Sequence, residues 1–497
     1  MMSAGIALLL LVATTGCGRR AARPTEATIG YQHELVTLDP HAHDDETTRA
    51  VLQGIFEPLV RLSPDLKIEP CLAERWTTPS PTRWRFRIRA GVFFHDGTPL
   101  TTEAVLASLR RAYGGNGSTV ATYLSSVASF QRAADEPQSI EILTVRPFPL
   151  LLTRLAMIDI VPPGFDAHHP VGTGPYRWVS GTPRGPLVLQ RWDRYWGPPP
   201  DVETLRIRSV PTEEQLLRLL NMQVLDVMAA VTRHFLNGHP PGPAYTVIRV
   251  PTLTTLMLGF NMRDPRYQDA RVREAIDLAI NRGDLVNEAF PGQCARVADS
   301  LLPVEVFGYS PAKVAAAADP GRARRLLRAA GVPEGAEVIL EYSGERPMVI
   351  AFLSAALSRI GLRLRARRYS YETFYRRFLE GKSGVFFFGW SFRFADASDF
   401  LDAAVHSREP ERRFGLQNGS GYADPAVDRW IEEASTESNS AKRLDLIHNI
   451  LERVARDRPY LPLYHLSQTV LVRKPFTIHP RQGSWLVPQD LGLPYED

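Results

Sequence analysis

The sequence lacks several features by which a chain can be assigned a chemistry. Its 497 residues include only three cysteines, with no Cys-x-x-Cys pair and no Cys/His cluster, so a zinc site is not expected. The 58 lysines and arginines are interspersed with 54 acidic residues, without the basic stripe that binds nucleic acid. No Ser/His/Asp set and no carboxylate dyad stands in a catalytic pattern. We therefore expect neither an enzyme nor a cofactor.

Two of the cysteines, Cys71 and Cys294, lie far apart in the sequence and allow two interpretations. They could form a disulfide in an oxidising compartment. Alternatively, both could be buried thiols, since free cysteine is among the residue types most often buried. The sequence leaves both interpretations open.

Long hydrophobic runs are also missing, apart from one short segment at the start. Residues 4–13 are apolar, and about ten such residues are too few to span a bilayer but suit the core of a signal peptide. The following Thr-Thr-Gly-Cys17 resembles the lipobox of bacterial lipoproteins, although Thr14 replaces the usual leucine and no Lys or Arg precedes the apolar segment. We expect a signal peptide at 1–16, lipidation of Cys17 and a tether at 17–26. Plain secretion, a misplaced start or a cytoplasmic protein are the alternatives.

Strand-like and helix-like segments alternate along the rest of the chain, which is typical of an α/β fold. Residues 84–89 (WRFRIR) alternate apolar and basic side chains and predict a half-buried strand. Thr101 predicts a helix N-cap, and Thr212 with Gln215 predicts a capping box. Residues 337–367 predict a strand, a helix and a second strand in succession.

An ordered series of short segments carries more information than any one of them. They are LDPHAHDDETTRAVLQGIFEPLV (38–60), LAERW (72–76), WRFRIRAGVFFHDGTPLTTEAVLASLRRA (84–112), VGTGPYRW (171–178), RWDRYWG (191–197), GFNMRDPRYQDARVREAIDLAINR (259–282), DPGRARRLLRAAG (319–331) and RDRPYLPLYH (456–465). In this order and spacing the chain resembles family five of the bacterial extracellular solute-binding proteins, the peptide- and nickel-type receptors of ABC importers.

The resemblance implies a two-lobed α/β fold of the periplasmic-binding-protein type (a Venus flytrap) with an additional small domain. Lobe I would comprise 27–65, 172–255 and 466–497, the small domain 66–171, and lobe III 256–465. Ligand would lie between lobes I and III, with a hinge near residues 255 and 465. The partners implied are a small solute, which could be a peptide, and an ABC permease with its ATPase. The protein would be an extracytoplasmic monomer held to the membrane only by its lipid anchor.

Four metal-ligating side chains stand close together at His41, His43, Asp44 and Asp45. They could bind a metal, form a polar edge of the cleft or belong to a solvated turn. The resemblance places this segment along the cleft, so Asp45 and Glu46 are candidate ligand-binding residues. The His168-His169 pair beside Asp166 is expected to be a surface loop.

The loop GWSFRFADASDF (389–400) holds the remaining candidates, Trp390, Arg393 and Asp396. In peptide-binding members of the family an aspartate three residues after the tryptophan binds the peptide ammonium group, whereas Arg393 occupies that position here. Arg393 could bind an anionic ligand by charge-assisted hydrogen bonds. It could instead pair with Asp396 or Asp399 and fix the loop, or Asp396 could take over the ammonium group.

The function expected from the resemblance is capture of a solute for an ABC importer. The same scaffold could serve a ligand sensor or a chaperone that is not coupled to import. Transcription regulators that borrow this domain carry an N-terminal helix-turn-helix, for which the sequence before residue 27 offers no room.

Overall fold

The computed structural model describes residues 24–115, 117–290, 295–311, 317–483 and 486–494. Cys17 and Cys294 lie outside these residues, and so do the predicted signal peptide, lipid anchor and Cys71–Cys294 disulfide. Cys71 is a buried thiol, 1% exposed, beside the Glu57 carboxylate. No helix in the described ranges is long and apolar enough to cross a membrane.

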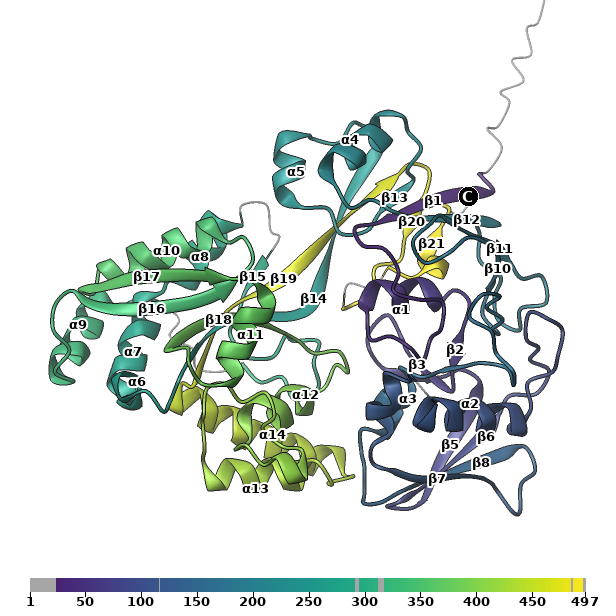
Figure 1. Cartoon of the computed structure of the whole chain (residues 1–497), viewed down its shortest axis with the longest axis horizontal. Coiled ribbons are helices and arrows are strands. Elements are labelled where there is room, and N and C mark those ends of the chain that lie inside the picture. Colours follow the sequence, from purple (N-terminus) through teal and green to yellow (C-terminus); the bar gives the residue numbers. More distant parts are fainter. Residues whose placement is uncertain (1–23, 116, 291–294, 312–316, 484–485, 495–497) are drawn as a thin grey trace, which may run out of the picture.

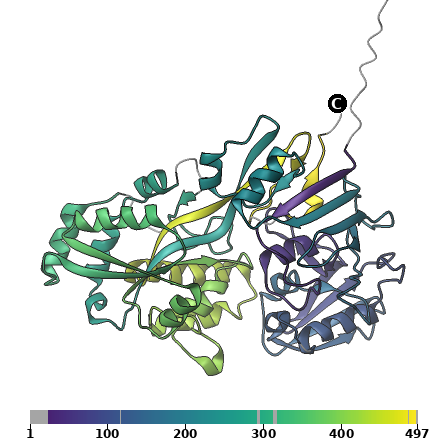
Figure 2. The ribbon, with the colours of Figure 1, turned by 45° about the horizontal axis from the view of Figure 1, so that its top comes forward.

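Two bodies of different size are joined by a pair of long strands (Figure 1). These are β14 (Tyr245–Phe260) and β19 (Tyr460–Arg473), which pair antiparallel from Tyr245–Arg473 to Gly259–Tyr460. The pairing is interrupted between Pro251 and Thr255. In the second view the two strands remain the main link between the bodies (Figure 2). The central eleven-stranded sheet therefore runs continuously from one body into the other.

The body that contains the first strand has a mixed sheet and its own core. Its strands lie in the order β10-β11-β12-β1-β13, with β1 parallel to both β12 and β13. The elements are β1 (Glu26–Tyr31), α1 (Glu46–Leu52), β10 (Tyr176–Ser180), β11 (Leu187–Arg191), β12 (Thr204–Ser209), α4 (Glu213–Asn221), β13 (Val227–Met228), α5 (Arg233–Gly238), β20 (Thr477–Ile478) and β21 (Leu491–Gly492). Thr212 accepts a hydrogen bond from the Gln215 amide at the start of α4, which confirms that predicted helix start.

A four-stranded antiparallel sheet in the order β5-β6-β8-β7 is packed against α2 in the same body. The elements here are β2 (Glu57–Pro58), β3 (Val60–Leu62), β4 (Ile68–Pro70), β5 (Ala73–Ser80), β6 (Arg83–Ile88), α2 (Thr102–Gly114), β7 (Val127–Arg132), β8 (Ser139–Thr144), α3 (Leu151–Leu155) and β9 (Asp159–Ile160). Strand β6 alternates buried and half-buried residues as predicted, and Thr101 caps α2. Below, the structural unit formed by these elements, from β2 to β9, is called the small domain.

The other body continues the central sheet with strands β14, β18, β16 and β17 in that order. Helices α7, α8 and α10 share a hydrophobic core on one face, and α11, α13 and α14 share a second core on the opposite face. The elements are α6 (Pro265–Gln268), α7 (Ala270–Ala279), α8 (Arg282–Ala289), β15 (Ala295–Val297), α9 (Pro320–Ala329), β16 (Ala336–Ser343), α10 (Pro347–Ser358), β17 (Leu362–Tyr369), α11 (Tyr371–Leu379), β18 (Val385–Ser391), α12 (Ser398–Phe400), α13 (Pro425–Ala434) and α14 (Ser440–Asp457).

Because Gly259 in strand β14 has no side chain, the Phe386 ring packs directly against its backbone. A Cβ atom at Gly259 would lie 2.1 Å from Cε2 of the Phe386 ring, well inside van der Waals contact. We expect Gly259→Ala to lower the free energy of unfolding by about 1–3 kcal/mol, because the buried ring has to shift. Gly114→Ala, at the end of α2 with no atom within 4 Å of the added Cβ, is the control. Denaturant unfolding of both variants checks this, and equal stabilities would contradict it.

Candidate ligand-binding site

A cavity of about 650 Å³ lies between the two bodies. Most of its lining comes from β18, the loop that follows it and helix α11, and the side facing them contributes Asp44 and Tyr123. The charged and aromatic lining residues are Asp44, Tyr123, Arg346, Tyr371, Phe374, Tyr375, Phe378, Phe387, Phe388, Trp390, Arg393, Phe394 and Asp399. The site is therefore rich in aromatic rings and contains two arginines.

Trp390 lines this cavity from the end of strand β18. Its ring packs edge-on against Phe400 at a centroid distance of 5.1 Å. The indole nitrogen is buried and has no hydrogen-bond acceptor among the described residues. Trp390 thus offers the cavity an apolar ring surface, while its indole N–H is buried within the protein.

Arg393 also lines the cavity, and its guanidinium reaches across it to Asp44, in the loop before α1. The Tyr123 hydroxyl donates to the same Asp44 carboxylate, and Arg49 lies 3.7 Å from it. The predicted pairing of the Arg393 side chain with Asp396 or Asp399 is not what the structure shows. Instead, the backbone N–H of Arg393 donates to Asp399 at 3.2 Å.

Asp396 does not line the cavity. Its side chain is buried, and both carboxylate oxygens accept hydrogen bonds of 2.7 Å from the Arg443 guanidinium of α14. The Ser398 amide donates to the same carboxylate at 2.9 Å. Because its oxygens are occupied within the protein, Asp396 fixes the loop instead of facing a ligand.

The predicted cleft-edge residues have local roles. Asp45 caps helix α1 by accepting from the backbone N–H and the hydroxyl of Thr48, each at 2.7 Å. Glu46 is exposed and lines a separate small cavity of about 160 Å³. Neither carboxylate lines the cavity that contains Trp390 and Arg393.

The histidines of the same segment are buried, so the solvated turn is not observed. His41 is 1% exposed, with Nε2 2.8 Å from the Asp159 carbonyl and Nδ1 accepting from Arg111. Burial lowers the pKa of His43 to about 4. His169 pairs with Asp166 in an exposed loop, as predicted.

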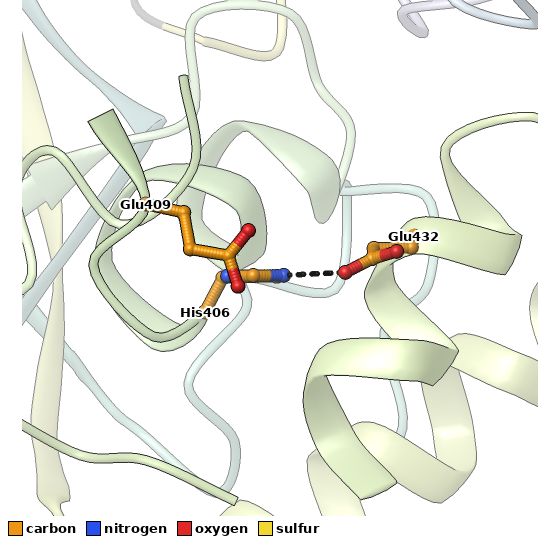
Figure 3. A group of neighbouring side chains, drawn as sticks. All are labelled: His406, Glu409 and Glu432. Atoms are coloured by element: carbon orange, nitrogen blue, oxygen red, sulfur yellow. Dashed lines mark hydrogen bonds and ion pairs between the residues drawn. The ribbon is translucent and has the colours of Figure 1, made fainter. Parts of the chain in front are cut away.

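Only one group of potential metal ligands occurs among the described residues, and it lies outside the cavity. Figure 3 shows the His406 ring pointing at Glu432, with Glu409 beside it. The Arg412 guanidinium donates to Glu432 at 2.6 and 2.8 Å and to Glu409 at 3.0 Å. A single guanidinium thus binds both carboxylates, and the group is an ion-pair network.

Arg346 was not among the predicted candidates, yet it lines the cavity at the start of helix α10. Its guanidinium carbon lies 5.2 Å from the centre of the Phe387 ring. The Nε atom is buried without an acceptor, and no described carboxylate lies within 4.0 Å of the side chain. Burial raises the pKa of the nearby Tyr464 to about 12, and the positive charge of Arg346 opposes that shift.

The loop after Arg393 inserts into the small domain. Phe394 is 5% exposed and belongs to that domain's hydrophobic core, where its ring meets Tyr123 edge-on at 5.2 Å. Arg154, from helix α3, lies over the same ring at 3.4 Å. Burial raises the pKa of Asp399 to about 6 and that of Asp402 to about 7, with Arg154 opposing both shifts.

We expect Asp402→Asn to change how stability depends on pH. The native carboxyl holds its proton up to about pH 7, whereas an unfolded aspartate loses it near pH 3.8, so wild-type stability falls across this interval. The charged groups around Asp402 are Arg146, Arg154, Asp396 and Arg443. Because the variant lacks this titration, its Tm relative to wild type should rise between pH 4.5 and 7.5.

Thermal unfolding at the two pH values measures the effect. Asp284→Asn, at an exposed carboxylate in α8, is the control and should show a constant difference in Tm. A constant difference for Asp402→Asn would contradict the prediction.

Two bodies joined by paired strands, with a solute-sized cavity between them, define a two-lobed binding protein. The chain belongs to the bacterial extracellular solute-binding proteins of family 5: the family model described as "Bacterial extracellular solute-binding proteins, family 5 Middle" matches residues 67–411. This confirms the resemblance and the fold. The protein is a non-enzymatic substrate-binding protein of an ABC importer, of an extracellular or periplasmic family.

Curated relatives and solved structures cover nearly the whole chain. The glutathione-binding proteins GsiB of Shigella flexneri serotype 5b and Escherichia coli K12 are each 25% identical over 500 residues, or 95% of this chain and 94% of theirs. The structure of HbpA2 from Haemophilus parasuis matches with a TM-score of 0.83 and 20% identity, over 95% of this chain and 100% of that one. The structure of DppA from Helicobacter pylori, in complex with the peptide STSA, matches with a TM-score of 0.73 and 22% identity, over 94% of this chain and 98% of that one.

Proposed function

We propose that the protein captures a small solute bearing a negatively charged group and that Arg346 is the anchor for that group. The observation that carries this proposal is the Arg346 guanidinium, which faces the cavity with a buried Nε and no described carboxylate within 4.0 Å. Arg346 as a whole is half-buried, and its guanidinium can match a carboxylate, phosphate or sulfate with two parallel hydrogen bonds. The ligand supplies the missing charge.

A free ammonium group on the ligand has no corresponding partner. The cavity contains two carboxylates, Asp44 and Asp399, and both already accept hydrogen bonds from the protein. Asp396 is engaged by Arg443. The proposed solute therefore lacks an amine at this position, or leaves it in solvent. Relatives named for glutathione and for a bound peptide support a carboxylate-bearing ligand, and the free amino group that both ligands also carry is the group that this proposal leaves in solvent.

We further propose that the two bodies act as the lobes of a closing receptor, with the interrupted pairing near Pro251 and Thr255 as the hinge. The proposal includes the domain limits that the resemblance implies. Lobe I comprises 27–65, 172–255 and 466–497, the small domain 66–171, and lobe III 256–465. The ion pair between Arg393 and Asp44 spans the cleft, so it forms only when the lobes come together. Arg393 thus stabilises the closed arrangement of the lobes, whereas Arg346 binds the ligand.

The identity of the charged group can be tested with blocked peptides. The tripeptide Ala-Ala-Phe should keep its affinity when its N-terminus is acetylated and lose it when its C-terminus is amidated. Arg346→Gln should weaken binding of the acetylated acid by about tenfold to a hundredfold, because a hydrogen bond to a charged group is lost. Titration calorimetry on residues 24–497 measures these affinities.

Arg359→Gln is the matched control, because Arg359 is an exposed arginine just after the C-terminal end of the same helix. It should bind like wild type. Loss of affinity on acetylation, but not on amidation, would contradict the proposal.

Membrane attachment through Cys17 is proposed on the lipobox-like sequence alone. Cys17→Ser should move the protein from the membrane fraction to the soluble extracytoplasmic fraction of expressing cells. Fractionation followed by mass spectrometry of the N-terminal peptide measures this, with Cys71→Ser as the control. A wild-type protein without a diacylglyceryl group on Cys17 would disprove the anchor and leave the proposed ligand binding unaffected.

A further inference from the structure

One wall of the cavity is built from aromatic side chains that the proposed charge recognition does not use. Helix α11 presents Tyr371 and Tyr375 one turn apart, with ring centroids 5.8 Å apart and an interplanar angle of 12°. Tyr371 is 70% exposed and lines the cavity together with Tyr375. A stacked pair of tyrosines is therefore open on the side facing the space between the lobes.

The stack continues into the protein, which fixes its position. Tyr375 lies against Phe378 at 6.1 Å and 29°, and Phe378 lies against Phe388 of β18 at 5.5 Å and 32°. Phe388 in turn contacts the fully buried Tyr460 at 5.7 Å. We call Tyr371, Tyr375, Phe378 and Phe388 the aromatic wall. Because its inner members are held by the core, its outer faces are preorganised for a ligand.

The polar groups near the wall indicate what kind of ligand would fit. Neither tyrosine hydroxyl has a hydrogen-bond partner among the described residues. A quaternary ammonium ligand would also suit aromatic faces. However, Arg346 lines the same cavity without a described carboxylate within 4.0 Å and disfavours a cation, whereas Arg393 is paired with Asp44. An uncharged ring attached to an acid is compatible with both features.

We propose that the solute is an aromatic acid, or a short peptide acid with an aromatic side chain, whose ring stacks on the aromatic wall. This inference rests on the proposed function, since it assumes that the ligand's charged group is held by Arg346. Offset or edge-on contacts between aromatic rings contribute attraction beyond the burial of their area. The wall then selects for the ring, while Arg346 selects for the charge.

The proposal is tested with three acetylated tripeptide acids that differ only in their last side chain: Ac-Ala-Ala-Phe, Ac-Ala-Ala-cyclohexylalanine and Ac-Ala-Ala-Ala. Cyclohexylalanine keeps the size of the ring and removes its aromatic character. We expect the phenylalanine peptide to bind residues 24–497 about threefold to tenfold more tightly than the cyclohexylalanine peptide. Equal affinities for these two peptides would overturn the aromatic selection.

The double variant Tyr371→Leu, Tyr375→Leu should abolish this preference while keeping the affinity for Ac-Ala-Ala-Ala. Tyr113→Leu, at an exposed tyrosine in α2 outside the cavity, is the control and should retain the preference. A preference that survives in the double variant would place ring recognition elsewhere and overturn the proposal. If wild-type protein bound none of the three acids, the proposed function would fail and the inference with it.

A second measurement uses the natural ligand and separates the two proposals. Solute released by denaturing the purified protein is analysed by mass spectrometry and ultraviolet absorption. An acid that contains an aromatic ring supports both proposals. An acid without a ring overturns the aromatic wall as a selecting surface and leaves Arg346 as the anchor, whereas a cationic solute overturns both.

Discussion

The pairing of β14 with β19 is the constraint on which the rest of the structure depends. These two strands lie in the middle of the central sheet, so their backbone hydrogen bonds hold one body to the other. Their ladder is interrupted where the bodies meet, between Pro251 and Thr255. At this interruption Thr254 and Thr255 remain paired with β18, and the Leu253 carbonyl accepts a hydrogen bond from the Phe392 amide. The position of the cavity follows, because it lies beside this interruption and is lined by Thr254 and Leu256.

Much of the fold could be predicted from local sequence, because local rules govern it. Thr101 and Thr212 cap helices by short-range hydrogen bonds, and the strand-helix-strand unit β16-α10-β17 follows from periodicity. The position of Trp390 at the end of an apolar strand, where it lines the cavity, could be expected from the local sequence. The pairing of Arg393 with Asp44 could not be found, since 349 residues separate the two positions. Arg346 and the tyrosines of α11 stand in no motif, and only the fold brings them to one cavity.

The loop after β18 shows why an acidic residue in a binding motif is not by itself a ligand contact. Asp396 and Arg393 are three residues apart, yet their side chains serve different parts of the molecule. Asp396 is drawn inward by Arg443, because a buried arginine on α14 would otherwise lack a counter-charge. Arg393 points outward to a carboxylate on the facing body. The same short segment therefore both fixes itself to its own lobe and reaches across the cleft.

Insertion of Phe394 into the core of the small domain has a thermodynamic consequence for the receptor. Separating the bodies would transfer this ring from an apolar environment into water and remove it from beneath Arg154. Opening is thus opposed even when the cavity is empty. If the bodies separate as proposed, an equilibrium affinity measured in solution reports ligand contacts together with this resistance to opening. Because Phe394 also lines the cavity, a substitution there would change both contributions.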